Sequence, residues 1–225
     1  DIGGESTRPG AEVVPEGQQM ERTLPVIRDL RARSPVLISI DTTRRRVAEA
    51  ALAAGADIVN DISAGRDDPD LLPFLGGTDA GLVLMHMQGT PRNMQRDPRY
   101  DDVTGEITAF LRARLGAAVD AGIDPERVVL DPGIGFGKQL VHNLVILRDL
   151  ALFKDLARPL LLGASRKSFI AKVTGAPVER RLGGSLASAI HAAQSGARIL
   201  RVHDVADTRQ ALDIFAAIQN PDPYI

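Results

Sequence analysis

Short apolar runs alternate with longer amphipathic segments along the chain. The runs are rich in Val, Ile and Leu and are too short for helices, so they predict buried strands. Most of them end directly before a polar residue such as Asp41, His86 or Asp131. The predicted strands cover residues 35–40, 57–61, 81–85, 128–130, 159–163 and 197–202.

The segments between these runs have apolar residues at helical spacing. Ile107 and Leu111 mark the buried face of the longest one, which ends at Gly122. We expect Pro25 to interrupt or restart the first helix, and Thr42 or Thr43 to cap the second. The predicted helices cover residues 20–30, 44–54, 70–75, 107–121, 140–150, 181–195 and 206–219.

This strand–helix alternation predicts an α/β fold with a parallel sheet covered on both faces. A doubly wound sheet would concentrate its site at one or two loops. Here a candidate polar residue follows every strand, which favours a (β/α)8 TIM barrel with its site at the carboxyl ends of the strands. No break in composition divides the chain, so we expect a single barrel domain over residues 1–225.

The number of predicted units falls short of a whole barrel. A strand end at residues 1–4 precedes the six units, and the chain begins with Asp1 instead of Met. The first strand–helix unit and most of the second strand are then missing. Since such barrels typically run to about 250 residues, we expect roughly 50 further residues upstream in the natural protein.

Composition narrows the classes of function. The 225 residues carry a net charge of −2 and contain no cysteine. This excludes disulfides, thiolate zinc sites and a cysteine nucleophile, and it suits a cytoplasmic location. We expect no nucleic-acid partner, and no membrane partner, because no apolar run approaches about 18 residues.

The clearest motif is V-V-L-D-P-G-I-G-F-G-K at residues 128–138. A short strand delivers Asp131, Pro132 ends it, and three glycines allow the backbone to bend and approach a ligand closely. Such a turn can simply shape a loop. The recurrence of polar residues after other strands favours a site for a small polar molecule instead.

Two acids and an amide indicate the kind of ligand. Asp41, Asn60 and Asp131 follow three different strands and would project into one mouth. A carboxylate accepts two parallel N–H bonds, and an amide offers one donor and one acceptor group. Together they suit a 2-amino-4-oxo heterocycle better than a sugar or a metal.

Cations occupy the same rim. Arg8, Lys167, Arg201 and His203 follow strand ends or lie in the adjoining loops. Arginine binds phosphate in a bidentate manner and stacks on flat rings. The ligand should therefore have a polar ring at one end and phosphates at the other.

The remaining basic residues have ordinary explanations. We expect Lys138 and Arg166 to form surface ion pairs, and His142 and His191 to be structural residues within helices. His86 stays open between a structural and a functional role.

Taken together, the motifs resemble dihydropteroate synthase, the folate-pathway enzyme, in order and over essentially the whole chain. The matching segments are D-I-G-G-E-S-T-R-P-G (1–10), S-I-D-T-T (39–43), D-I-V-N-D-I (57–62), L-M-H-M-Q-G-T-P (84–91), D-P-G-I-G-F-G-K (131–138), S-R-K-S (165–168) and R-V-H-D-V (201–205).

The resemblance implies a TIM barrel and an alkyl-transferring enzyme that joins p-aminobenzoate to (7,8-dihydropterin-6-yl)methyl diphosphate and releases pyrophosphate. It also implies small-molecule substrates, a homodimer, and sulfonamides as competitors for the p-aminobenzoate site. Asp41, Asp131, Lys167 and Arg201 would be the catalytic residues, and Arg201 would stack on the pterin. The pterin pocket would be lined by Asp41, Asn60, Met85, Asp131 and Lys167, the pyrophosphate held by Thr7, Arg8 and His203, and p-aminobenzoate bounded by Phe136, Ser168 and the loop around Thr7.

The family also implies a cofactor. Mg2+ would assist the departing pyrophosphate, and its main protein ligand is an Asn that would lie upstream of Asp1. A mobile loop of the family would also lie upstream, so we expect this chain to have poor activity or none. Two alternatives stay open: a corrinoid-type pterin-binding methyltransferase domain, which has no need of S-R-K-S, and a non-catalytic paralogue.

Overall fold

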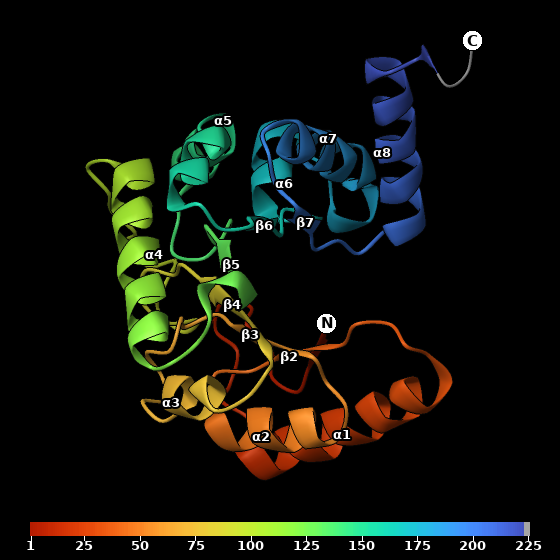
Figure 1. Ribbon diagram of the computed structural model, residues 1–225. Helices are drawn as coiled ribbons and strands as arrows, with labels where there is room; N and C mark the ends of the chain where they lie inside the picture. The colour runs from red at the N-terminus through yellow and green to blue at the C-terminus, as the bar shows by residue number, and fades with distance from the viewer. Residues whose placement is uncertain (223–225) are drawn as a thin grey trace.

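The computed structural model describes residues 1–222, in which parallel strands alternate with helices (Figure 1). Each strand contains Val, Ile or Leu and ends at, or directly before, a polar or glycine residue. The strands are β1 (Ile2–Gly3), β2 (Ser39–Asp41), β3 (Ile58–Asp61), β4 (Gly81–Met85), β5 (Val128–Asp131), β6 (Leu161–Leu162) and β7 (Ile199–Leu200).

The strands follow one another in space in the order of the sequence. β1 to β5 form one parallel sheet and β6 pairs with β7 in a second. A parallel bridge between Leu130 and Leu160 connects the two sheets. This sequential parallel arrangement, with helices outside, is the architecture of a TIM barrel and confirms the predicted fold class.

The register brings the carboxyl ends of neighbouring strands level. Asp41 at the end of β2 lies opposite Asn60 on β3, and Met85 at the end of β4 lies opposite Asp131 on β5. Candidate site residues on adjacent strands are therefore neighbours at the same edge.

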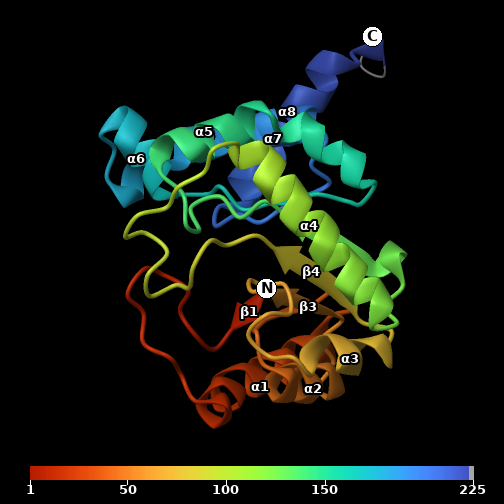
Figure 2. The ribbon, with the colours of Figure 1, turned by 90° about the vertical axis from the view of Figure 1, so that its left-hand side faces the viewer.

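Helices cover the strands from outside. Figure 2 shows α1 to α3 on one side of the strands and α5 to α8 on the other. Where strands and helices meet, buried Val59, Leu82 and Leu130 belong to the same core as Ile27 and Leu111 from the helices. The helices are α1 (Glu16–Arg33), α2 (Arg45–Ala53), α3 (Leu71–Gly76), α4 (Val103–Asp120), α5 (Leu140–Arg148), α6 (Ser168–Thr174), α7 (Leu182–Gln194) and α8 (Val205–Gln219).

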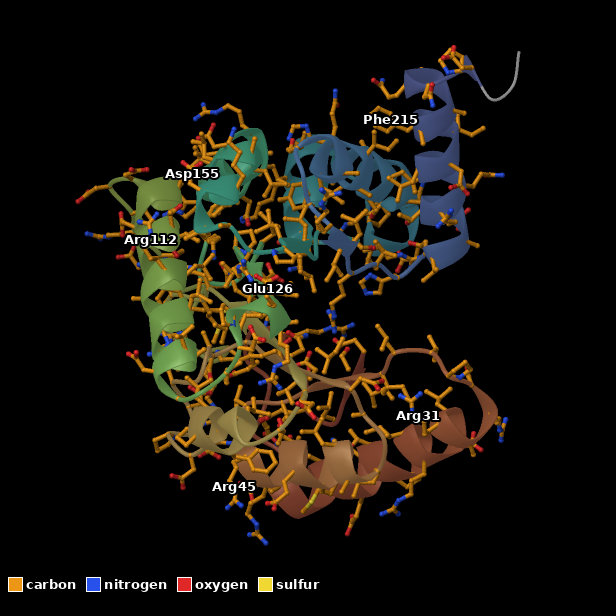
Figure 3. The ribbon with its side chains drawn as sticks, viewed as in Figure 1. Arg31, Arg45, Arg112, Glu126, Asp155 and Phe215 are labelled. Atoms are coloured by element: carbon orange, nitrogen blue, oxygen red, sulfur yellow. The ribbon has the colours of Figure 1, made fainter. Side chains whose placement is uncertain are left out.

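Polar contacts fix the amino ends of the strands, away from the candidate site. Arg31 of α1, labelled in Figure 3, donates to the carboxylate of Asp57 and to the carbonyl oxygen of Gly55. Asp57 in turn accepts from the backbone N–H of Ile38. The chain before β2 and the chain before β3 are thereby attached to α1.

Two local predictions were wrong. α1 continues through Pro25, because the carbonyl that loses its partner, on exposed Glu21, can bond to water. α2 starts at Arg45, whose N–H donates to the carboxylate of Asp68 at 2.8 Å, and neither Thr42 nor Thr43 is the N-cap residue. The Thr42 hydroxyl accepts from the N–H of Arg44 in the preceding turn instead.

Two further differences concern the end of one predicted helix and the presence of one that was not predicted. The helix predicted over 140–150 ends at Arg148, and a 3-10 segment follows over Leu150–Leu156. α6 was not anticipated, since its seven residues are too few for a clear periodic pattern. Of residues 1–222, no helix is both long enough and apolar enough to cross a membrane.

Candidate active site at the carboxyl ends of the strands

Arg201 joins two acids that come from distant parts of the chain. Its Nε donates to Oδ2 of Asp1 at 2.7 Å and its Nη2 to Oδ2 of Asp41 at 3.4 Å. Asn60 donates to the same Asp1 oxygen at 3.3 Å. The carboxyl ends of β2, β3 and β7 therefore meet, as the sequence predicted for Asp41, Asn60 and Arg201, and Asp1, directly before β1, joins them.

Asp1 was missed as a site residue. Its carboxylate also accepts from the hydroxyl of Ser39 at 2.6 Å, and its side chain is only 14% exposed. Its signal in the sequence is a polar position directly beside the apolar strand residue Ile2. Asp1 orients both the Arg201 guanidinium and the Asn60 amide.

Burial shifts the titration of both predicted acids. Burial raises the pKa of Asp41 to about 6, although the neighbouring Arg201 opposes this shift. Burial also raises the pKa of Asp131, opposed by Lys167 and by the N–H of Gly133. Both carboxyls are thus held where a cationic or N–H-rich ligand would favour their ionised forms.

The glycine turn holds Asp131 in place. The N–H of Gly133 donates to Oδ1 of Asp131 at 2.7 Å. Gly133 has φ +70°, and a Cβ there would lie 1.9 Å from the carbonyl oxygen of His86. The turn therefore packs directly on the backbone at the end of β4, and only glycine permits this approach.

Lys167 reaches the same turn from the loop after β6. Its ammonium lies 4.7 Å from the centroid of the Phe136 ring and donates to the carbonyl oxygen of Ile134. Burial lowers the pKa of Lys167 to about 8, opposed by Asp131. The structure thus brings Asp131, Phe136 and Lys167 together, as predicted, with Met85 opposite Asp131.

His203 is held by a residue that was predicted only as part of a motif. Ser165 Oγ lies 3.0 Å from Nδ1 of His203 and accepts from its backbone N–H at 3.2 Å. Arg166 beside it forms a bidentate pair with Asp204 at 2.9 and 2.5 Å. The loops after β6 and β7 are thereby joined. Arg166 makes the predicted ion pair, with a side chain that is 35% exposed.

Thr7 and Arg8 lie elsewhere on the rim. Both belong to the loop between β1 and α1, where Gly10 donates to the carbonyl oxygen of Pro91. Among the described residues, no hydrogen bond or ion pair joins either of them to Arg201 or His203. Ser168, the first residue of α6, is exposed.

Two cavities open at this part of the molecule. The first, of about 570 Å3, is lined in part by Asp1, Asn60, Arg201 and His203. The second, of about 480 Å3, is lined in part by Thr7 together with Arg44, Arg66 and Arg92. Asp131 and Lys167 line neither of these two cavities.

The expectation for Lys138 was wrong. Its side chain is buried, with only 2% of the residue exposed, and it contacts His86 at 2.9 Å. Nothing local signals this burial, since a lysine after a glycine turn is ordinarily exposed. His142 and His191 have the expected structural roles: His142 accepts from the N–H of Gln139 and His191 bonds the carbonyl of Leu147.

The carboxylates at the rim do not form a metal centre by themselves. Within residues 1–222, no group of three or more His, Asp or Glu side chains could hold a metal ion. Asp1 and Asp41 both bind the Arg201 guanidinium instead. The described donor set therefore does not fit Mg2+ on its own.

Comparison with known proteins gives a consistent picture. The family model described as "Pterin binding enzyme" matches residues 1–203. The dihydropteroate synthase of Synechocystis sp. is 45% identical over 219 residues, which cover 97% of this chain and 76% of that protein. That of Escherichia coli is 43% identical, over 96% of this chain and 77% of the relative.

Solved structures of dihydropteroate synthases also superpose closely on this chain. A sulfonamide complex of Yersinia pestis dihydropteroate synthase superposes with a TM-score of 0.93 at 41% identity, covering 96% of this chain and 78% of that one. Xanthomonas albilineans dihydropteroate synthase with 4-aminobenzoic acid gives 0.92 at 44% identity, covering 97% and 78%. The same enzyme with 7,8-dihydropteroate gives 0.87 at 42% identity, covering 93% and 79%.

Proposed function

The chain belongs to the dihydropteroate synthases of the pterin-binding enzyme family, and on that premise we propose how its own residues perform the reaction. The enzyme condenses p-aminobenzoate with (7,8-dihydropterin-6-yl)methyl diphosphate to give dihydropteroate and pyrophosphate, a transferase step of folate biosynthesis. The observation that carries the proposal is the placing of acids beside cations: Asp41 pairs with Arg201, and Asp131 and Lys167 both contact the glycine turn after β5.

The buried acids bind the pterin ring. Asp131 accepts the forked N–H pair of the aminopyrimidine, and Asn60 contributes one donor and one acceptor group beside it. Asp41 lies next to Asn60 across the strand pair and faces the same ring. Met85, opposite Asp131, supplies an apolar surface to the flat heterocycle.

The cationic residues bind the face of the pterin ring and the diphosphate. Arg201 has a half-exposed side chain, so its planar guanidinium can stack on the pterin while it stays beside Asp41. His203, oriented by Ser165, and Arg8 with Thr7 stabilise the departing diphosphate. This assignment requires the loop of residues 5–13 to approach the end of β7 when substrate binds.

The second substrate lies beside the glycine turn. Phe136, Ser168 and the loop around Thr7 bound the space for the p-aminobenzoate ring. A known complex of a relative contains a sulfonamide drug, and we propose that sulfonamides compete at this subsite here too.

The reaction exchanges one bond for another. The C–O bond between the pterin methylene and the diphosphate breaks, and its electron pair leaves with pyrophosphate. The amine nitrogen of p-aminobenzoate then donates its lone pair to the methylene carbon, and the proton it loses passes to solvent or pyrophosphate. Asp41 and Asp131 stabilise the cationic pterin that develops between these events, so fixed charges supply most of the acceleration.

Mg2+ and the assembly state stay predictions. Because the described carboxylates do not fit the metal on their own, none of these steps uses it. We also propose a homodimer and a cytoplasmic location, which measurements of mass in solution and fractionation would test.

The decisive experiment uses the protein as its gene encodes it and measures pyrophosphate release from the pterin diphosphate with and without p-aminobenzoate, together with calorimetric binding of the pterin diphosphate. We expect release that depends on both substrates and is inhibited by a sulfonamide. Binding without turnover would favour a non-catalytic paralogue, and methyl transfer to a corrinoid would favour the methyltransferase alternative. Absence of pterin binding would refute the proposed site.

A further inference from the structure

The side-chain amine of Lys138 is buried among three hydrogen-bond acceptors, and burial lowers its pKa, an effect that Asp131 opposes. Its ammonium contacts Nδ1 of His86 at 2.9 Å and donates to the carbonyl oxygens of Phe136 at 2.9 Å and His86 at 3.3 Å. An ammonium has three N–H donors, so each has one acceptor. Burying a charge is costly unless it is bonded in this way.

His86 is a neutral acceptor in this arrangement. Since an ammonium can only donate, Nδ1 of His86 accepts and the ring proton lies on Nε2. Burial lowers the pKa of His86 to about 2, assisted by Lys138 and Arg66. The ring packs edge-on against Phe110 with centroids 4.8 Å apart, which holds it at the end of β4.

The ammonium attaches the glycine turn to β4. The turn lies so close to this strand end that a Cβ on Gly133 would meet the His86 carbonyl oxygen at 1.9 Å, and one on Gly137 would meet the Gln88 carbonyl oxygen at 2.3 Å. Lys138 bonds the same His86 carbonyl from one side and the turn carbonyl of Phe136 from the other.

The opposite side of the turn carries the candidate site. Asp131 begins the turn, and Lys167 binds both the carbonyl of Ile134 and the ring of Phe136. Movement of the turn relative to β4 therefore displaces Phe136 and Lys167, and it removes the Gly133 N–H that orients the Asp131 carboxylate.

We propose that Lys138, through His86, is a positioning residue that fixes the glycine turn so that Asp131 and Lys167 meet the pterin ring. The inference rests on the proposed function of this site. It assigns a role to a residue that touches no substrate.

The test removes the side-chain amine of Lys138 and keeps a side chain of similar size. Lys138→Met should fold, since methionine fills irregular core space, and should raise KM for the pterin diphosphate by about tenfold to a hundredfold, as a displacement near 1 Å can. KM for p-aminobenzoate should change less. Lys154→Met is the matched control, because Lys154 is exposed on the 3-10 segment after α5 and should leave both constants unchanged.

A pH profile separates positioning from simple support of the fold. A turn displaced in Lys138→Met would move Lys167 and the N–H of Gly133, the groups that most strongly oppose the raised pKa of Asp131. Removing Lys138 should therefore move the acid limb of kcat/KM for the pterin diphosphate to higher pH. A purely structural role would lower the melting temperature and leave this limb in place.

His86 supplies a second pair of variants should Lys138→Met fail to fold. His86→Asn keeps an acceptor near Nδ1 and should retain most of the pterin affinity, whereas His86→Leu removes it and should lose affinity by a similar factor to Lys138→Met. Equal affinities for His86→Asn and His86→Leu, or an unchanged pterin KM and acid limb in Lys138→Met, would overturn the proposal. A wild-type protein that binds no pterin diphosphate would refute the proposed function itself and this role with it.

Discussion

The ammonium of Lys167 lies over the ring of Phe136, 4.7 Å from its centroid. The contact joins the loop after β6 to the glycine turn after β5, and burial holds the pKa of Lys167 near 8. Much of the behaviour expected of this protein follows from such cations held between buried acids and carbonyls.

Lys167 should make the free energy of unfolding depend on pH in the alkaline range. In the unfolded chain it titrates near 10.5, and in the folded protein at about 8. Between these values the unfolded state binds more protons, so the free energy of unfolding rises with pH. Lys167→Met should raise it by roughly 1–3 kcal/mol at pH 7 and reduce its rise between about pH 8 and 10. Urea unfolding of both proteins across this range checks it, and equal slopes would contradict the buried charge.

Asp131→Asn should weaken binding of the pterin diphosphate by about 2–3 kcal/mol. The amide replaces one acceptor oxygen by a donor that faces the N–H groups of the ring. Calorimetry measures the loss. Asp155→Asn, on an exposed acid labelled in Figure 3, should bind as the wild type does, and equal affinity for both variants would remove Asp131 from the pocket.

Arg201→Ala should weaken binding of the pterin diphosphate and also raise the pKa of Asp41. Without the guanidinium, Asp41 loses the cation that opposes its raised pKa of about 6. The acid limb of kcat/KM should therefore move above pH 6. Arg201→Lys should restore only part of the affinity, because an ammonium neither stacks nor forms a fork. Arg209→Ala on α8, an exposed partner of Asp213, serves as the control, and an acid limb that stays in place would exclude the Asp41 contact.

Gly133→Ala should be much more damaging than Gly175→Ala, although both glycines have nearly equal φ, +70° and +73°. At Gly133 a Cβ would meet a carbonyl oxygen at 1.9 Å, whereas at Gly175 no described atom lies within 4 Å. We expect about 1 kcal/mol lost at Gly175 and about 2–4 kcal/mol at Gly133. Thermal unfolding compares them, and similar losses would mean that the turn can move away from β4.

The sequence predicted the parts of the site that strands themselves position. Asp41, Asn60 and Asp131 follow apolar runs, and parallel pairing places such residues at one edge. The alternation of strands and helices limits the possible order of the strands, so it could also be inferred which of these residues lie on adjacent strands.

What the sequence could not supply depends on contacts between distant loops. Lys138 is buried because His86, 52 residues away, offers it an acceptor. Pro25 sits in a continuous helix because its side faces water, which no local pattern reveals. The placement of Thr7 and Arg8 apart from Arg201 depends on a loop without regular structure, whose path pairing rules do not fix.

The bond between Asp1 and Arg201 spans 200 positions of the chain. Bringing together residues so far apart in the chain costs loop-closure entropy, and parallel strands paired over long separations fold slowly. Affinity for the pterin would consequently emerge only when the final strand has docked. During refolding, the recovery of pterin binding would therefore report the docking of the last strand, after most of the secondary structure has formed.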